Sequence, residues 1–216
     1  MQAAAIKPLP GARAATASIK TRRRFEYFIR KLLKLSGINF HNKLARQWEI
    51  PSGLLSGSTR RKLIPDLVFD LGGQTYVFDV KYKAFDFRFG VSREDLFQLH
   101  TYVGQLSNEY IVAGCGFIYP IRESRWHAQG LEGTFGILSD TFSQGDHSIS
   151  FHVFFLKVPE QGDMPSDTWP SHFRSAFKVT CNIFTHKFLA ALEQADAAVI
   201  RSKWTPRPIR KQAINA

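Results

Sequence analysis

The sequence predicts an α/β fold in which a mixed central sheet is flanked by helices. Helical periodicity marks residues 18–36, 92–106 and 173–201. Between the helical segments lie short runs rich in Val, Phe and Tyr, which are typical of strands. This order of elements is typical of a sheet with helices packed on its faces. With 216 residues, 44% of them apolar, the chain can bury one substantial core.

The first predicted helix, residues 18–36, has apolar side chains three and four positions apart. These are Phe25, Phe28, Ile29, Leu32 and Leu35, and Gly37 follows the last turn. Residues 1–17 are rich in Ala and Pro, and we expect them to form a flexible basic arm. Residues 38–50 are expected to be extended, and residues 51–62 form a Gly- and Ser-rich loop. Residues 18–204 then make up the folded domain, and residues 205–216 a basic C-terminal tail.

A β-hairpin is predicted from two strand-like runs, residues 63–71 and 74–83, which the pair Gly72-Gly73 separates. With this two-residue turn, position 68 pairs with 77, and Asp66 lies opposite Asp79. Ser92 is a good N-cap for the next helix, 92–106. Further strands are predicted at residues 110–119, 133–139 and 148–158. A loop over 159–171 leads to the last helix.

Charge is distributed unevenly along the chain. The sequence holds 29 Lys and Arg against 18 Asp and Glu, a net charge of +11. Most of the excess lies in residues 1–62, where only Glu26 and Glu49 are acidic. Such asymmetry predicts a polyanionic partner, nucleic acid before an anionic membrane, although a basic soluble surface is the alternative. We expect DNA as the partner and no membrane association.

Two further features exclude other classes. The longest uncharged apolar run, Tyr110–Ile121, is shorter than the roughly 20 residues that a membrane span needs. The two cysteines, Cys115 and Cys181, form no CxxC pair, which excludes a zinc ribbon and an iron–sulfur cluster. Two unpaired thiols suit a reducing compartment, so a cytoplasmic location is expected.

Asp66, Asp79 and Lys81 are the candidate chemical groups. Strand alternation places them on one face of the hairpin, opposite the apolar Leu67 and Phe78. Two carboxylates facing each other across a ladder are destabilising, and a divalent cation between them removes the conflict. Lys81 can hold an attacking water or stabilise charge on a phosphate. The pattern predicts metal-assisted phosphodiester hydrolysis; the alternative is a strand-start acid beside a surface ion pair.

These residues resemble a known signature. Pro65-Asp66 followed by Asp79-Val80-Lys81 is similar to the motif of the PD-(D/E)xK nuclease superfamily. The strings FDVKYKAF (78–85) and SREDLFQLHTY (92–102) resemble more narrowly the nuclease subunit of the McrBC 5-methylcytosine restriction system. The resemblance implies a restriction-endonuclease-like core and a QxxxY motif, supplied here by Gln98 and Tyr102.

The resemblance also implies a metal site. Asp66 and Asp79 would bind Mg²⁺, with Mn²⁺ able to substitute, and the Val80 carbonyl would be a further ligand. Glu26, on the first helix, matches a Glu that assists the metal in the family. An i,i+4 pair of Glu26 with Arg30 is the simple alternative.

The remaining site residues follow from the same resemblance. Lys81 would activate water or stabilise the developing charge, and Gln98 and Tyr102 would position the site or the DNA backbone. A buried amide and an ordinary core tyrosine are the alternatives for the last two. Seven basic residues are candidates for contacts with phosphates, although solvated helix ends and loops would explain them equally: Arg22, Arg23, Arg24, Arg60, Arg61, Lys62 and Lys83.

Together these patterns predict a Mg²⁺-dependent DNA endonuclease of a restriction or defence system. Two alternatives stay open: a nuclease subunit of a transposition or DNA-repair complex, and a non-catalytic nucleic-acid-binding subunit on the same fold. Because the sequence has no GxxxxGK[ST] motif, any NTP-driven step needs another protein, for which the resemblance suggests an AAA+ GTPase. Because each chain has one predicted catalytic site, cutting both DNA strands would suggest a homodimer or a partner.

Overall fold

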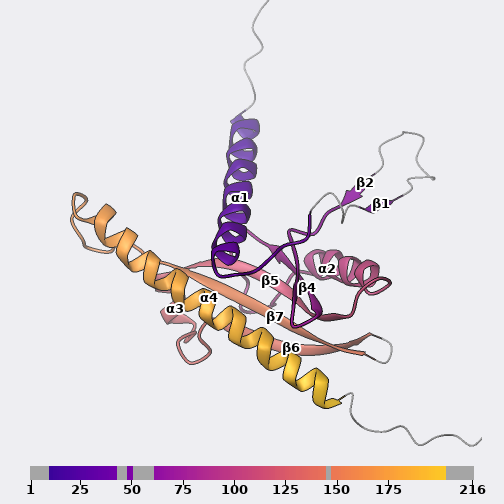
Figure 1. Cartoon of the computed structure of the whole chain (residues 1–216). Helices are drawn as coiled ribbons and strands as arrows, with labels where there is room; N and C mark the ends of the chain where they lie inside the picture. The colour runs from indigo at the N-terminus through magenta and orange to yellow at the C-terminus, as the bar shows by residue number, and fades with distance from the viewer. Residues whose placement is uncertain (1–9, 43–47, 51–60, 145–146, 203–216) are drawn as a thin grey trace, which may run out of the picture.

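The computed structural model of the chain describes residues 10–42, 48–50, 61–144 and 147–202. Its centre is a five-stranded mixed sheet in the order β3-β4-β5-β7-β6, and a separate two-stranded sheet pairs β1 with β2 (Figure 1). The strands are β1 (Trp48–Ile50), β2 (Arg61–Leu63), β3 (Leu67–Leu71), β4 (Gln74–Val80), β5 (Val112–Arg122), β6 (Ile137–Gln144) and β7 (His147–Val158). The helices are α1 (Pro10–Leu35), α2 (Arg93–Leu106), α3 (Glu123–Ala128) and α4 (Trp169–Ser202). The predicted α/β class is confirmed.

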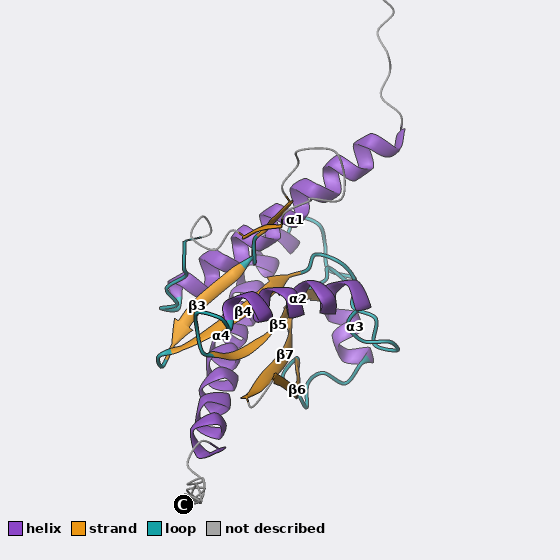
Figure 2. Ribbon diagram, turned by 90° about the vertical axis from the view of Figure 1, so that its right-hand side faces the viewer, coloured by secondary structure: helices purple, strands orange, loops and turns teal. Residues whose placement is uncertain are grey.

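Helices cover both faces of the central sheet. Figure 2 shows the sheet between α4 on one side and α2 and α3 on the other. The parallel pairs β4–β5 and β5–β7 form the middle of the sheet, and antiparallel strands β3 and β6 form its edges. The N-terminal part of α1 projects away from this body (Figure 1). Within the described residues, no helix combines the length and the apolar character that a transmembrane span requires.

The hairpin of β3 and β4 has the predicted register. Val68 pairs with Val77, and Leu71 pairs with Gln74. The turn residues Gly72 and Gly73 have φ angles of 60° and 80°, which are the positive values that a type I′ turn needs at both positions. Glycine adopts these values without a steric penalty, so the turn sequence itself determines the register.

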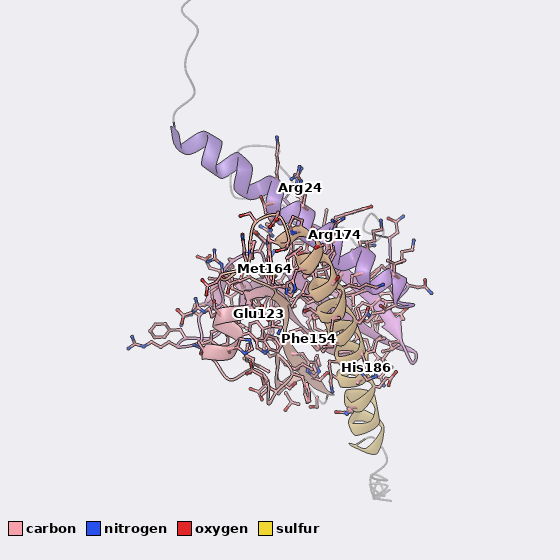
Figure 3. All side chains as sticks on the ribbon, turned by 90° about the vertical axis from the view of Figure 1, so that its left-hand side faces the viewer. Arg24, Glu123, Phe154, Met164, Arg174 and His186 are labelled. Atoms are coloured by element: carbon pink, nitrogen blue, oxygen red, sulfur yellow. The ribbon has the colours of Figure 1, made fainter. Side chains whose placement is uncertain are left out.

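The hairpin is buried on both faces, whereas the sequence suggested one apolar face and one face left for the site. Phe69 and Phe78 pack with Phe188 of α4 in the first core, where Phe154 also lies against α4 (Figure 3). On the opposite face, Val77 belongs to a second core that α2 completes. A strand inside a sheet covered on both sides is apolar on both faces, and polar groups enter only where it ends.

Several boundaries differ from the prediction. Helix α1 begins at Pro10, so residues 10–17 of the predicted arm are helical, since proline is tolerated in a first turn. The run 63–71 is divided between β2 and β3 because Pro65 carries no N–H for a ladder. Strand β6 lies at 137–144 instead of 133–139, and the short helix α3 was not predicted. The division into arm, domain and tail stays a prediction.

Candidate active site

The candidate site lies at the carboxyl end of β4. Asp79 is 1% exposed and Lys81 is 6% exposed. The Lys81 Nζ lies 2.6 Å from Asp79 Oδ2. The backbone N–H of Lys81 donates to the Ile118 carbonyl of β5 (2.9 Å), which fixes the chain just beyond the last residue of the strand. The predicted pairing of Asp79 with Lys81 is therefore present, but as a buried ion pair instead of a surface one.

Helix α2 brings the predicted Gln98 and Tyr102 to this pair. Gln98 Oε1 accepts a hydrogen bond from Lys81 Nζ (2.9 Å), and Gln98 Nε2 donates to the Tyr102 hydroxyl (2.7 Å). The hydroxyl in turn donates to the Ile64 carbonyl (3.3 Å). Because the two side chains lie at i,i+4 on one helix face, they form a continuous chain of hydrogen bonds from the ammonium group to the segment before β3.

Asp95 is a member of the site that the sequence did not single out. Its Oδ1 lies 3.0 Å from Lys81 Nζ, and its Oδ2 contacts Lys83 Nζ. Ser92, the predicted N-cap, donates from its hydroxyl to Asp95 Oδ2 (2.6 Å). From the sequence alone, Asp95 is an ordinary acid in the first turn of a helix. Its spacing of three residues to Gln98, which places both on one side of α2, was the available signal.

Asp66 lies beside the end of β4. Its Oδ2 accepts from the backbone N–H of Val80 (2.9 Å), and its main-chain carbonyl accepts from Arg30 Nη1 (3.1 Å). Asp66 is 8% exposed and lies in the bend that precedes β3. Since the N–H and C=O of one strand residue point to the same side, the Val80 carbonyl faces the same edge as the Asp66 carboxylate.

Burial and charge shift the ionisation of the site. Burial raises the pKa of Asp79 above its usual value, although the positive charges of Lys81 and Arg22 oppose this. Burial alone would lower the pKa of Lys81, but Asp79 and Asp95 outweigh it, so the pKa is raised. For Asp95, burial is outweighed by hydrogen bonds from Lys83, Ser92 and Lys81, and its pKa is lowered. Lys81 is thus a stable ammonium group at neutral pH.

The donor set suits a hard divalent cation. Asp79 Oδ2 is a buried carboxylate oxygen that has the Lys81 ammonium at ion-pair distance but no hydrogen bond of regular geometry within the described chain. Together with the Asp66 carboxylate and the Val80 carbonyl, it offers the oxygen ligands that Mg²⁺ prefers. Over residues 10–42, 48–50, 61–144 and 147–202, no three His, Cys, Asp or Glu side chains gather as a metal cluster. Water and substrate phosphate would have to complete the coordination, which is usual for Mg²⁺.

Helix α1 contributes Arg22 and Arg30 to the surroundings of the site. Arg22 is exposed, and its charge acts on both Asp79 and Tyr102. Burial lowers the pKa of Arg30, while the charges of Glu26 and Asp66 oppose that shift. Glu26 therefore lies near Arg30, as the i,i+4 alternative expects, and its role as a metal ligand stays a prediction.

The other basic candidates are distributed differently. Arg23 and Arg24 are exposed on α1, where Figure 3 labels Arg24. Arg60 lies outside the described residues, and Arg61 and Lys62 belong to β2, although their side chains are not among those described. Lys83 is placed beside the site through its contact with Asp95. Their roles in binding phosphates remain predictions.

Residues 19–120 match the model of a family described as McrBC 5-methylcytosine restriction system component. The matched stretch is just under half of the chain and runs from α1 through the β3–β4 hairpin and α2 into β5. It includes Asp66, Asp79, Lys81, Asp95, Gln98 and Tyr102. No curated protein matches the chain. The match supports a likeness to a component of this restriction system.

Proposed function

We propose that the chain is a metal-dependent nuclease that hydrolyses phosphodiester bonds in DNA as part of a restriction system. The observation that carries the proposal is the arrangement around Lys81. Its ammonium contacts Asp79, Asp95 and Gln98 at the end of β4, beside the Asp66 carboxylate. The match of this same stretch to the restriction-system family supports the assignment to DNA cleavage.

Each group then has a distinct role. Asp66, Asp79 and the Val80 carbonyl would hold Mg²⁺, which when bound polarises a phosphate and lowers the pKa of a bound water. Because the pKa of Lys81 is raised, this side chain is protonated at neutral pH and serves as a hydrogen-bond donor and positive charge, not as a general base. Gln98 fixes the position of that ammonium group through its 2.9 Å hydrogen bond. Positive charge held in this way stabilises the negative charge that develops on the phosphate.

A second candidate function is a nucleic-acid-binding subunit that does not cleave. Two observations favour it. Lys81 Nζ lies 2.6 Å from the Asp79 oxygen that a metal would use, and the described residues form no cluster of three His, Cys, Asp or Glu side chains. This candidate predicts salt-sensitive DNA binding with no cleavage in any divalent metal.

A plasmid assay separates the two functions. Supercoiled plasmid, methylated or unmethylated, is incubated with the full chain in Mg²⁺, in Mn²⁺ and in EDTA. We expect nicked or linear product in the metals, none in EDTA, and none from Asp79→Asn. Asp70→Asn is the matched control, since Asp70 lies on the same hairpin but its side chain is 50% exposed. Equal cleavage by Asp79→Asn and the control would refute the proposed site.

An NTP-driven partner also belongs to the proposal. The chain carries no GxxxxGK[ST] motif, so translocation along DNA would be powered by another protein such as an AAA+ GTPase. Adding such a partner with GTP should accelerate cleavage by the wild-type chain and leave Asp79→Asn inactive. If a GTPase restores cleavage to Asp79→Asn, the catalytic residues belong to the partner.

A further inference from the structure

A groove of about 610 Å³ opens beyond the carboxyl end of β4. Tyr82, Lys83 and Phe87, from the segment after β4, line part of it, and Arg122 and Arg125 line it from the end of β5 and from α3. The carboxyl ends of parallel strands are where open α/β sheets commonly bind ligands. This volume lies within the ~300–1,000 Å³ that is typical of small-ligand sites. A groove of this size is too small to hold a length of duplex.

The groove is positively charged. Three cationic side chains line it, and none of its lining residues is Asp or Glu. The Arg122 side chain is 82% exposed, and its Nε lies 4.0 Å from Glu160, a long and solvated ion pair. Arg125 donates to the Phe85 carbonyl (3.2 Å), and its guanidinium lies 5.6 Å from the Phe87 ring centroid. Arg125 is therefore held in position, while Arg122 is available to an anion.

Three carboxylates lie beside the groove. Asp95 contacts both Lys83 and Lys81, so two lysines share its charge. Glu160 accepts from the Ser124 backbone N–H (2.8 Å), and Glu123 accepts from Lys157 Nζ (3.0 Å). These contacts lower the pKa of both acids, so both stay ionised at neutral pH, and the charge of Glu123 is balanced by Lys157. Because two lysines share Asp95, and Arg125 forms no ion pair with a carboxylate of the described residues, the groove keeps a surplus of positive charge, which favours an anionic ligand.

An aromatic surface lies next to this charge. The Tyr82 side chain is 47% exposed, and its ring lies 5.6 Å from the Phe25 ring of α1. Phe25 packs against Tyr82, so an exposed aromatic ring lies just beyond the end of β4. Aromatic rings of this kind stack on unpaired bases, whereas bases inside a duplex are already stacked.

We propose that this groove binds an unpaired nucleotide of the strand that adjoins the scissile phosphate. Arg122 and Arg125 contact its phosphate, and Tyr82 stacks on its base. The position relative to the scissile phosphate rests on the proposed function, because Lys83 of the groove shares Asp95 with Lys81. An acidic peptide would satisfy the cations but would leave the aromatic surface unused, so a nucleotide fits both features.

Binding without metal tests the proposal independently of cleavage. Fluorescence anisotropy in EDTA measures the affinity of the full chain for a labelled single-stranded oligonucleotide and for its duplex. We expect Arg122→Gln to reduce the slope of log affinity against log salt by about 0.7, the value of one single-strand phosphate contact. Tyr82→Ala should weaken single-strand binding roughly 5-fold to 150-fold, and Tyr82→Phe should retain most of it.

Lys178→Ala is the control, because it removes an exposed positive charge from α4, on the other face of the sheet. Single-strand binding by Arg122→Gln and Tyr82→Ala equal to that of Lys178→Ala would overturn the proposal. If Arg122→Gln and Tyr82→Ala lost as much affinity for an acidic peptide as for the oligonucleotide, the groove would be a general anion site, and the proposal would also be overturned. Plasmid cleavage that depends on Asp79 with unchanged single-strand binding by the groove variants would leave the proposed function intact and refute the groove alone. Groove-dependent binding without cleavage would refute the proposed function instead.

Discussion

Replacing Lys81 by Met removes the ammonium group while keeping a side chain of similar length near the Phe117 ring. Asp79, 1% exposed, would then be a buried carboxylate without its cation. Breaking a buried ion pair by removing one partner costs about 3–5 kcal/mol. For a chain of this size, each kcal/mol shifts the melting temperature by roughly 2–4 °C. Lys81→Met should therefore melt about 6–20 °C below the wild type at neutral pH.

The pH dependence gives this prediction a direction. Burial raises the pKa of Asp79 in the folded chain, so the folded state disfavours its charged form, and stability falls as pH rises above the ordinary value of 3.8. Without Lys81 the pKa rises further, and this fall becomes larger and extends to higher pH. The difference in melting temperature between Lys81→Met and the wild type should therefore grow from pH 5 to pH 8.

Differential scanning calorimetry at pH 5 and pH 8 measures this difference. The double variant Asp79→Asn with Lys81→Met removes both charges and should recover most of the lost stability, while plasmid cleavage stays absent. A loss that is the same at both pH values, or a double variant no more stable than Lys81→Met, would refute the argument that a buried charge pair holds the site together.

Three further outcomes follow from the contacts described. Asp95→Asn should lower cleavage about 10–100-fold, measured by activity assay, because it removes the carboxylate that contacts Lys81 and Lys83. Because folding lowers the pKa of Asp95, the variant should be less stable than the wild type at neutral pH, and melting curves should show this difference disappearing as pH falls below about 4. Tyr102→Phe should cost about 1–3 kcal/mol in urea unfolding, since its hydroxyl links a side-chain amide to a main-chain carbonyl, and unchanged stability would argue against this network. Burial lowers the pKa of His152 to about 4, so the folded state disfavours its protonated form. The free energy of unfolding of the wild type should therefore fall by about 3 kcal/mol as pH falls from 6.5 to 4, and His152→Phe should show a flatter profile over that range in the same unfolding measurements.

Local signals made the centre of the fold predictable. The turn Gly72-Gly73 determines the hairpin register, and the register places Asp79 and Lys81 at the end of β4. The i,i+4 spacing places Gln98 and Tyr102 on one face of α2. All of these are short-range relations along the chain, which is why the sequence reveals them.

Long-range packing was less accessible. The role of Asp95 depends on how α2 is seated on β4, because its carboxylate must reach Lys81 and Lys83 from another element. The burial of Val77 depends on the same seating. Alternation within a strand shows which side chains share a face, but it does not show which faces a helix later covers. The groove at Arg122 and Arg125 likewise arises only when β5 ends beside the segment after β4.

Helix α2 both closes a core and contacts the Lys81 ammonium group. Leu99 and Val103 of α2 pack into the second core, while Asp95 and Gln98 of the same helix contact Lys81. Because the apolar face of α2 is fixed in this core, its polar face cannot move independently of it. Shortening the Leu99 side chain should therefore displace Lys81 although the two residues are on different segments of the chain. The cleavage rate and the melting temperature should fall together as the side chain at position 99 becomes smaller.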